Sequence, residues 1–140
     1  MKFLKSSILI ILAIIALVAC NAQSKETPKS EVVLSEDVQI YYFHNTKRCA
    51  TCNAVEAETR VALEMFYKDK VEAGEVTFVS LNLEEDEGAE IAKSLQVSGQ
   101  TLLIVKGEDQ VNLTNEGFMN ARTNPDKFHE ILKTQIDNLL

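Results

Sequence analysis

Runs of apolar residues alternate with polar stretches along the chain, and their spacing predicts strands and helices. Residues 38–43, 76–81 and 101–105 are rich in β-branched, aromatic and aliphatic side chains, a composition typical of strands. The run at 101–105 is continuously apolar, so we expect it in the middle of a sheet. Residues 106–109 have the composition of a turn, and residues 110–113 are the expected hairpin partner of that strand.

The first predicted helix follows the first strand. Residues 49–73 contain neither Gly nor Pro and are rich in Ala and Glu, and Gly74 then occupies the position that commonly ends a helix. The apolar residues at helical spacing, which we expect to be buried, are Ala54, Val55, Val61, Ala62, Met65 and Phe66.

Two further helices are predicted downstream. The acidic run at 84–87 suits the first turn of a short helix, because carboxylates there face the positive end of the helix dipole. The buried face of that helix is expected to be Ile91, Ala92 and Leu95. Asn124 and Pro125 open the last helix as N-cap and first residue. Its expected apolar face is Phe128, Ile131, Leu132, Ile136, Leu139 and Leu140. His129 lies beside that face, and we expect it at the surface.

The start of the chain has the features of a targeting segment. Lys2 and Lys5 precede an apolar run at 7–19, which has the length of a signal peptide and is short for a membrane span. The run ends in Leu-Val-Ala followed by Cys20, which resembles the bacterial lipobox, in which the cysteine becomes the lipid-bearing N-terminus. The alternative is an ordinary secretory signal with a chance cysteine at its end.

These features divide the chain into a lipoprotein signal peptide (1–19), a lipidated N-terminus with a flexible tether (20–36) and one domain (37–140). Within the tether, residues 32–34 could add an edge strand. The net charge of −7, without a basic stripe, argues against nucleic acid as a partner. We therefore expect an extracytoplasmic domain that is lipid-anchored to a bacterial membrane, in the periplasm or at the cell surface.

Three cysteines are an odd number for an exported protein. Assigning Cys20 to the lipid leaves Cys49 and Cys52, a Cys-x-x-Cys pair that can persist as a disulfide outside the cytoplasm. The pair could be a redox dithiol, a structural staple or part of a metal site. A staple across so small a loop would add little stability, and a structural metal site would need four ligands where the sequence has no second such pair.

The order strand-helix-strand-helix-strand-strand-helix, with the Cys-x-x-Cys pair after the first strand, resembles the thioredoxin superfamily. Residues 79–84 are similar to the thioredoxin strand that ends in an acidic turn, and residues 99–103 to the segment in which a cis-proline precedes a Thr and a strand. The resemblance covers residues 38–140 and implies an α/β thioredoxin-like fold, with a central mixed sheet flanked by helices. The opening Phe-His-x-x-x-Arg-Cys-x-x-Cys resembles more narrowly the exported ArsF family, labelled a nitrophenyl-compound nitroreductase subunit.

Two departures from the superfamily pattern bear on the chemistry. Gln100 occupies the place of the cis-proline, and we expect its peptide bond to be trans, because a cis bond to a non-proline residue costs roughly 2.5–4 kcal/mol. Thioredoxins also bury an acid in the first strand, whereas residues 40–43 contain none. Glu56, one turn after Cys52, is a weak substitute that we expect to be solvated.

The position of the pair at the start of a helix assigns different roles to its two cysteines. Unpaired N–H groups and the helix dipole stabilise a thiolate on Cys49, and Lys47 and Arg48 add positive charge beside it. We therefore expect Cys49 to be the nucleophile and Cys52 to resolve the mixed disulfide. His44 could tune the pair, although a histidine at a strand end is more commonly just exposed.

The sequence thus predicts a membrane-anchored thiol-disulfide oxidoreductase that acts on protein substrates and needs a redox recycling partner. No cofactor is expected, since the sequence has neither a flavin phosphate loop nor a nicotinamide fingerprint, and nitro reduction would need one of these cofactors. The alternative is a non-enzymatic module in which the same two thiolates bind a thiophilic ion such as copper(I) or arsenite.

Overall fold

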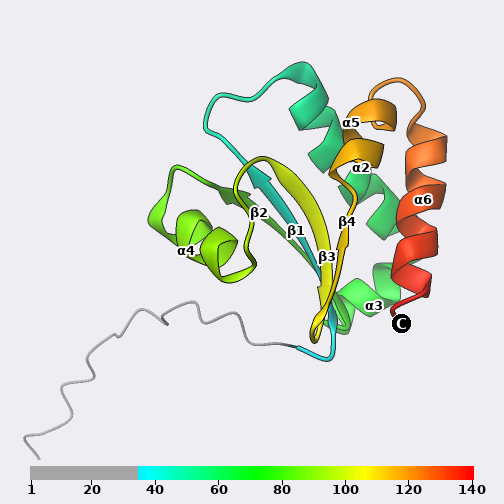
Figure 1. Ribbon diagram of the computed structural model, residues 1–140. Coiled ribbons are helices and arrows are strands. Elements are labelled where there is room, and N and C mark those ends of the chain that lie inside the picture. The colour runs from blue at the N-terminus through cyan, green and yellow to red at the C-terminus, as the bar shows by residue number, and fades with distance from the viewer. Residues whose placement is uncertain (1–34) are drawn as a thin grey trace, which may run out of the picture.

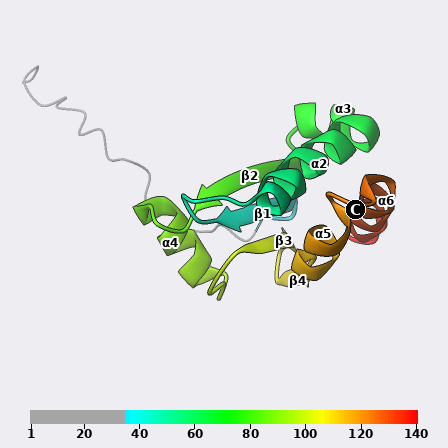
Figure 2. The same ribbon diagram turned by 90° about the horizontal axis from the view of Figure 1, so that it is seen from above.

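A computed structural model describes residues 35–140, which form one four-stranded sheet with helices on both faces (Figures 1 and 2). The strands are β1 (Val38–His44), β2 (Val76–Asn82), β3 (Thr101–Lys106) and β4 (Asp109–Asn112). Their order in the sheet is β2-β1-β3-β4, in which β1 and β2 are parallel and β3 is antiparallel to both β1 and β4. The prediction that residues 101–105 are central is therefore confirmed.

Five helices accompany the sheet in the described part of the chain: α2 (Ala50–Phe66), α3 (Lys68–Glu72), α4 (Asp86–Ser94), α5 (Thr114–Asn120) and α6 (Pro125–Asp137). Helices α2, α5 and α6 cover one face, and α4 covers the other (Figure 2). Each face has its own apolar core, one around Tyr42, Val55 and Phe128 and the other around Phe43, Ile91 and Leu103.

The segment predicted as one helix at 49–73 is divided into α2 and α3. Tyr67 leaves helical geometry between them, with φ −133° and ψ 19°. Its side chain is buried, and its hydroxyl donates a hydrogen bond to Asp137 Oδ1 of α6, 2.6 Å away. The break thus coincides with a contact between distant parts of the chain. The predicted end at Gly74 is confirmed, with a positive φ of 79°.

The predicted buried face of α2 was too broad. Val61 and Met65 are exposed, whereas Leu63, which the prediction left out, is buried. The buried residues of the helix are Cys52, Val55, Thr59, Ala62 and Leu63. These positions follow a single narrow stripe, because α2 contacts the sheet and α6 along one side only. At the other end of the chain Leu140, which we predicted to be buried, is exposed as well.

The prediction for His129 was also wrong. Its exposed fraction is 6%, and its Nε2 lies 2.8 Å from Oε2 of Glu58. Helix α6 packs directly against α2, so a residue beside its apolar stripe faces the neighbouring helix and not the solvent. By contrast, the predicted start of α6 is confirmed, because the Asn124 side chain accepts a hydrogen bond from the backbone N–H of Lys127.

The predicted signal peptide, the lipidation site Cys20 and the possible edge strand at 32–34 lie outside the described residues. Within residues 35–140, no helix combines the length and the apolar character that crossing a membrane requires.

Candidate active site around the cysteine pair

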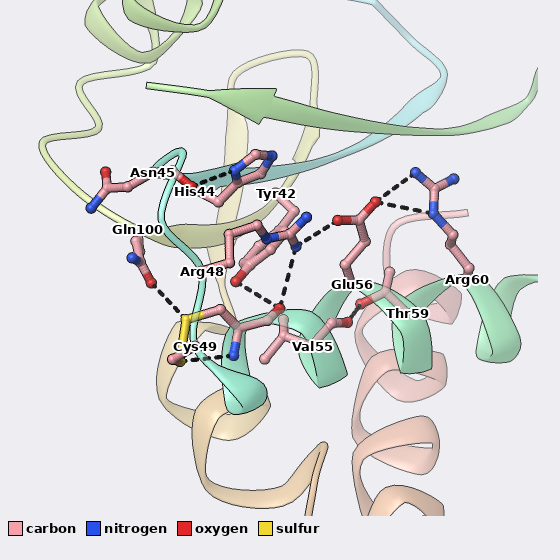
Figure 3. A network of polar contacts seen from close by, with 11 residues as sticks. Tyr42, His44, Asn45, Arg48, Cys49, Val55, Glu56, Thr59, Arg60 and Gln100 are labelled. Atoms are coloured by element: carbon pink, nitrogen blue, oxygen red, sulfur yellow. Dashed lines mark hydrogen bonds and ion pairs between the residues drawn. A yellow bond between two sulfur atoms is a disulfide. The ribbon is translucent and has the colours of Figure 1, made fainter. Parts of the chain in front are cut away.

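The strand register brings three chain segments together at one edge of the sheet. Strand β1 ends at His44, and the following loop leads into α2 at Ala50. Because β3 runs antiparallel to β1 and Thr101 pairs with Phe43, the residue before β3, Gln100, lies at the same edge. The first turn of α2 and the loop before β3 therefore face one another across the end of β1 (Figure 3).

Cys49 and Cys52 form a disulfide at this edge, with their Cα atoms 5.0 Å apart. Their environments differ sharply. Cys49 is the N-cap residue of α2 and is exposed, whereas only 3% of Cys52, one turn into the helix, is exposed. A partner molecule can therefore reach the sulfur of Cys49 but is hindered from reaching that of Cys52.

The sulfur of Cys49 takes the place that a Ser or Asp oxygen occupies at many helix starts. The backbone N–H of Cys52 points to Cys49 Sγ at 3.1 Å, and the carbonyl of Cys49 accepts the first helical bond from Asn53 N. A negative charge on Cys49 would thus accept a hydrogen bond from the backbone N–H of Cys52 at the positive end of the helix dipole. This geometry favours the thiolate form once the disulfide is reduced.

The carbonyl of Cys52 is held by two side chains from outside the helix. The Tyr42 hydroxyl donates to this oxygen at 3.0 Å, and Arg48 Nη2 donates to it at 3.4 Å (Figure 3). Tyr42 is fully buried in β1. The sequence identifies Tyr42 only as a strand residue, since nothing in the alternation of β1 distinguishes a structural tyrosine from one that contacts the cysteine turn.

Arg48 is turned back over the site. Its guanidinium lies 5.5 Å from the centre of the Tyr42 ring and forms an ion pair with Glu56 at 2.5 Å. Glu56 also binds Arg60, at 2.8 Å. The prediction that Glu56 is solvated was wrong, since only 18% of its side chain is exposed. Burial raises the pKa of Glu56, but the hydrogen bonds from Arg60 and Arg48 outweigh burial and hold that pKa below its usual value.

Gln100 approaches the buried sulfur. Its Oε1 lies 3.4 Å from Cys52 Sγ (Figure 3), and its peptide bond is trans, as expected. In the reduced pair, the thiol of Cys52 could donate a hydrogen bond to this oxygen. Gln100 thus places a polar atom beside the Cys52 sulfur, whereas a proline at this position has no polar side-chain atom to offer.

Two other predicted residues lie at the end of β1 and on the loop that follows it. His44 is half-buried and bonds through Nδ1 to the carbonyl of its neighbour Asn45, at 3.0 Å. Lys47 is exposed on the loop. Of the two basic residues expected beside Cys49, Arg48 is therefore the one whose charge is engaged within the site.

A shallow hollow of about 550 Å³ adjoins this edge and is lined in part by Asn45, Glu84, Lys93 and Gln100. It offers both charged and neutral polar groups next to the cysteine pair. Among residues 35–140, no three His, Cys, Asp or Glu side chains are grouped so as to hold a metal ion. This finding does not bear on an ion site formed by the two cysteine thiolates alone, which would need only two ligands.

The sequence matches no protein-family model and no curated protein. Solved structures that resemble the fold include a chloroplastic thioredoxin z, with 22% identity, TM-score 0.47, and coverage of 74% of this chain and 80% of that one. Mitochondrial thioredoxin 3 from Saccharomyces cerevisiae in its oxidised form has 20% identity, TM-score 0.44, and coverage of 72% and 81%. A malarial protein has 19% identity, TM-score 0.39, and coverage of 53% and 74%. These values are too low to transfer an activity, a substrate or a partner.

The architecture itself is more informative. The sheet has the strand order β2-β1-β3-β4, with β1 and β2 parallel and helices on both faces. The cysteine pair lies just after β1, at the N-terminal end of α2. The narrower resemblance to the ArsF family stays a prediction. The chain has an α/β thioredoxin-like fold, and its Cys49–Cys52 disulfide lies at the start of α2, just after β1.

Proposed function

We propose that the chain is a membrane-anchored, extracytoplasmic thiol-disulfide oxidoreductase that uses Cys49 and Cys52 on protein substrates. One observation carries the proposal: the exposed residue Cys49, whose sulfur is capped by the N–H of Cys52, is disulfide-bonded to a buried Cys52. A structural staple would not need one accessible sulfur at a helix N-terminus, whereas a nucleophile does.

The exchange runs through a mixed disulfide. In the reducing direction, the Cys49 thiolate attacks a substrate disulfide, and one substrate sulfur leaves as a thiolate that takes up a proton. Cys52 loses its proton and attacks Cys49 Sγ, which releases the second substrate sulfur and forms the Cys49–Cys52 disulfide. Two electrons pass to the substrate, and a dithiol partner must return two electrons to the pair. The same bonds exchange in reverse when the chain acts as an oxidant.

The proposed location rests on the sequence of the leader. The apolar run at 7–19 and the lipobox-like sequence before Cys20 support export and lipid attachment. Two or three acyl chains would hold the domain at a membrane, since each buried CH₂ contributes about 0.8 kcal/mol. The polar tether at 20–36 would then give the cysteine pair reach towards protein substrates.

Asymmetric trapping tests the proposed chemistry. The full chain carries Cys20→Ser as background together with Cys52→Ser. Separate samples of it are incubated with oxidised glutathione or with insulin as a protein disulfide. We expect a stable mixed disulfide on Cys49, because no second thiol can resolve it. Cys49→Ser should trap much less, since Cys52 is buried, and the variant without either cysteine sets the background. Mass spectrometry reads the adducts.

The competing interpretations give different results. A structural staple predicts no adduct in either variant. Equal trapping by both variants would contradict the assignment of Cys49 as nucleophile while leaving the redox chemistry intact. Tight binding of copper(I) or arsenite by the reduced pair, without any exchange with glutathione or insulin, would instead favour the ion-binding module.

A further inference from the structure

A positive charge beside the first turn of α2 is partly shielded from solvent. Arg48 directly precedes Cys49, and its guanidinium reaches the carbonyl of Cys52. Its side chain is 22% exposed, and that of its partner Glu56 is 18% exposed. A second ion pair, between Glu64 of α2 and Lys68 of α3, has side chains that are 68% and 57% exposed, respectively. Solvent and salt therefore screen the Arg48–Glu56 pair less than that surface pair.

The two charges act on the cysteine pair in opposite directions. The Arg48 cation lies beside the turn that contains both cysteines, so it favours a thiolate on Cys49. The Glu56 carboxylate, 2.5 Å from Arg48, cancels much of that field. Arg60 holds Glu56 from the other side, but it is the more exposed of the two arginines, and its charge is better screened. The balance between Arg48 and Glu56 thus sets the field at the site.

We propose that Glu56 is a positioning residue of the redox site that adjusts the reduction potential of the Cys49–Cys52 pair by neutralising Arg48. The inference rests on the proposed thiol-disulfide function and adds a mechanism that regulates it. Glu56 touches neither sulfur, so its influence passes through the guanidinium of Arg48.

The relevant equilibrium is exchange with glutathione. The protein disulfide and two reduced glutathione molecules form the protein dithiol and one oxidised glutathione molecule, with two electrons passing to the protein. Any group that stabilises the Cys49 thiolate stabilises the reduced protein, which raises the equilibrium constant and makes the disulfide a stronger oxidant. A group that destabilises the thiolate has the opposite effect.

This mechanism predicts shifts of opposite sign. Glu56→Gln leaves the Arg48 charge uncompensated and should raise the equilibrium constant with glutathione by about three- to tenfold. Arg48→Gln leaves the Glu56 carboxylate and should lower the constant by a similar factor. The double variant should return close to the unmodified chain. A tenfold change corresponds to about 30 mV for a two-electron couple.

The measurement uses the full chain with Cys20→Ser in every variant, so that a single dithiol titrates. Samples are equilibrated in glutathione buffers of graded ratio and quenched with an alkylating reagent, and the reduced fraction is read by mass spectrometry. Glu64→Gln is the matched control, because it removes a cation-paired carboxylate that lies on the same helix as Glu56 but far from the site, and it should leave the constant unchanged. Arg48→Lys keeps the positive charge beside the turn and should change the constant less than Arg48→Gln does.

The outcomes separate this inference from the function on which it rests. If the unmodified pair does not exchange with glutathione at all, the proposed function fails. A second outcome is that the cysteine pair exchanges while Glu56→Gln and Arg48→Gln shift the constant in the same direction, or while neither shifts it. In that case the Arg48–Glu56 ion pair serves only to hold the loop, and the electrostatic inference is wrong. Circular dichroism of each variant verifies folding, and the comparison of Glu56→Gln with Glu64→Gln keeps the test valid if Arg48→Gln fails to fold.

Discussion

His129 of α6 and Glu58 of α2 are 71 positions apart in the sequence, and their side chains meet with Nε2 of the histidine 2.8 Å from Oε2 of the glutamate. The contact joins the helix that carries Cys49 and Cys52 to the last helix of the domain. The histidine is buried and the glutamate is partly exposed, so the two partners depend on the contact to different degrees.

Replacing His129 should therefore cost more stability than replacing Glu58. His129→Ala removes buried packing together with the hydrogen bond and should lower the free energy of unfolding by about 2 kcal/mol. Glu58→Gln keeps a polar partner within reach of the ring and should cost less than about 1 kcal/mol. Urea unfolding at neutral pH measures both, and equal losses would contradict the contact as described.

The hydroxyl of Tyr42 should matter more than that of its neighbour. Tyr42→Phe removes the donor to the buried Cys52 carbonyl and should cost about 1 kcal/mol of unfolding free energy. Tyr41→Phe is the matched control, because its hydroxyl bonds only to the side chain of Gln39, and it should cost about half as much or less. A loss in Tyr41→Phe as large as that in Tyr42→Phe would show that the bond to Cys52 has no special weight.

Gly88 should not tolerate a side chain. A Cβ atom placed there would lie 2.0 Å from the backbone oxygen of Asn82, because α4 crosses closely over the end of β2. Gly88→Ala should lower the free energy of unfolding by about 3 kcal/mol or prevent folding. Gly99 has nothing within 4 Å of the corresponding position. Gly99→Ala should therefore leave the free energy of unfolding nearly unchanged, and it serves as the control in the same unfolding measurement.

Because the pKa of Glu56 is lowered in the folded chain, the free energy of unfolding should decrease as the solution becomes acidic. Its interaction with the two arginines is fully present above the pKa of an unfolded glutamate, about 4.3, and is lost as the pH falls through the lower pKa of the folded chain. Between pH 6 and 3 the unmodified chain should therefore lose stability more steeply than Glu56→Gln, which has no proton to gain at this position. Urea titrations across that range measure the two slopes, and parallel slopes would contradict the prediction.

Lipid attachment can be tested on the intact chain in a bacterial host. Cys20→Ala should abolish incorporation of labelled fatty acid and release the domain from the membrane or leave it unprocessed, because the thiol proposed to carry the lipid is gone. Cys49→Ala, which keeps Cys20, should be labelled like the unmodified chain. Fatty-acid labelling that survives Cys20→Ala would exclude the proposed anchor.

Local patterns in the sequence determined most of the fold. The three apolar runs became strands, and Asn124 and Pro125 start a helix as expected, since a side-chain cap and a fixed proline φ act within one turn of the chain. The position of Cys49 at a helix N-terminus could be predicted for the same reason. Helix α5 was missed, because its residues 114–120 lack an apolar repeat of their own and its Gly117 instead packs closely against Val55.

Only the tertiary structure decided which polar side chains take part in the site. Glu56 follows Cys52 by one turn, but its burial depends on Arg48 folding back over Tyr42, and His129 is buried only because α6 lies against α2. Gln100 reaches the sulfur of Cys52 across 48 positions of sequence, through the pairing of β1 with β3. The periodicity of a sequence identifies the face of each element, whereas contacts between elements depend on how those faces are paired and rotated, which no local pattern contains.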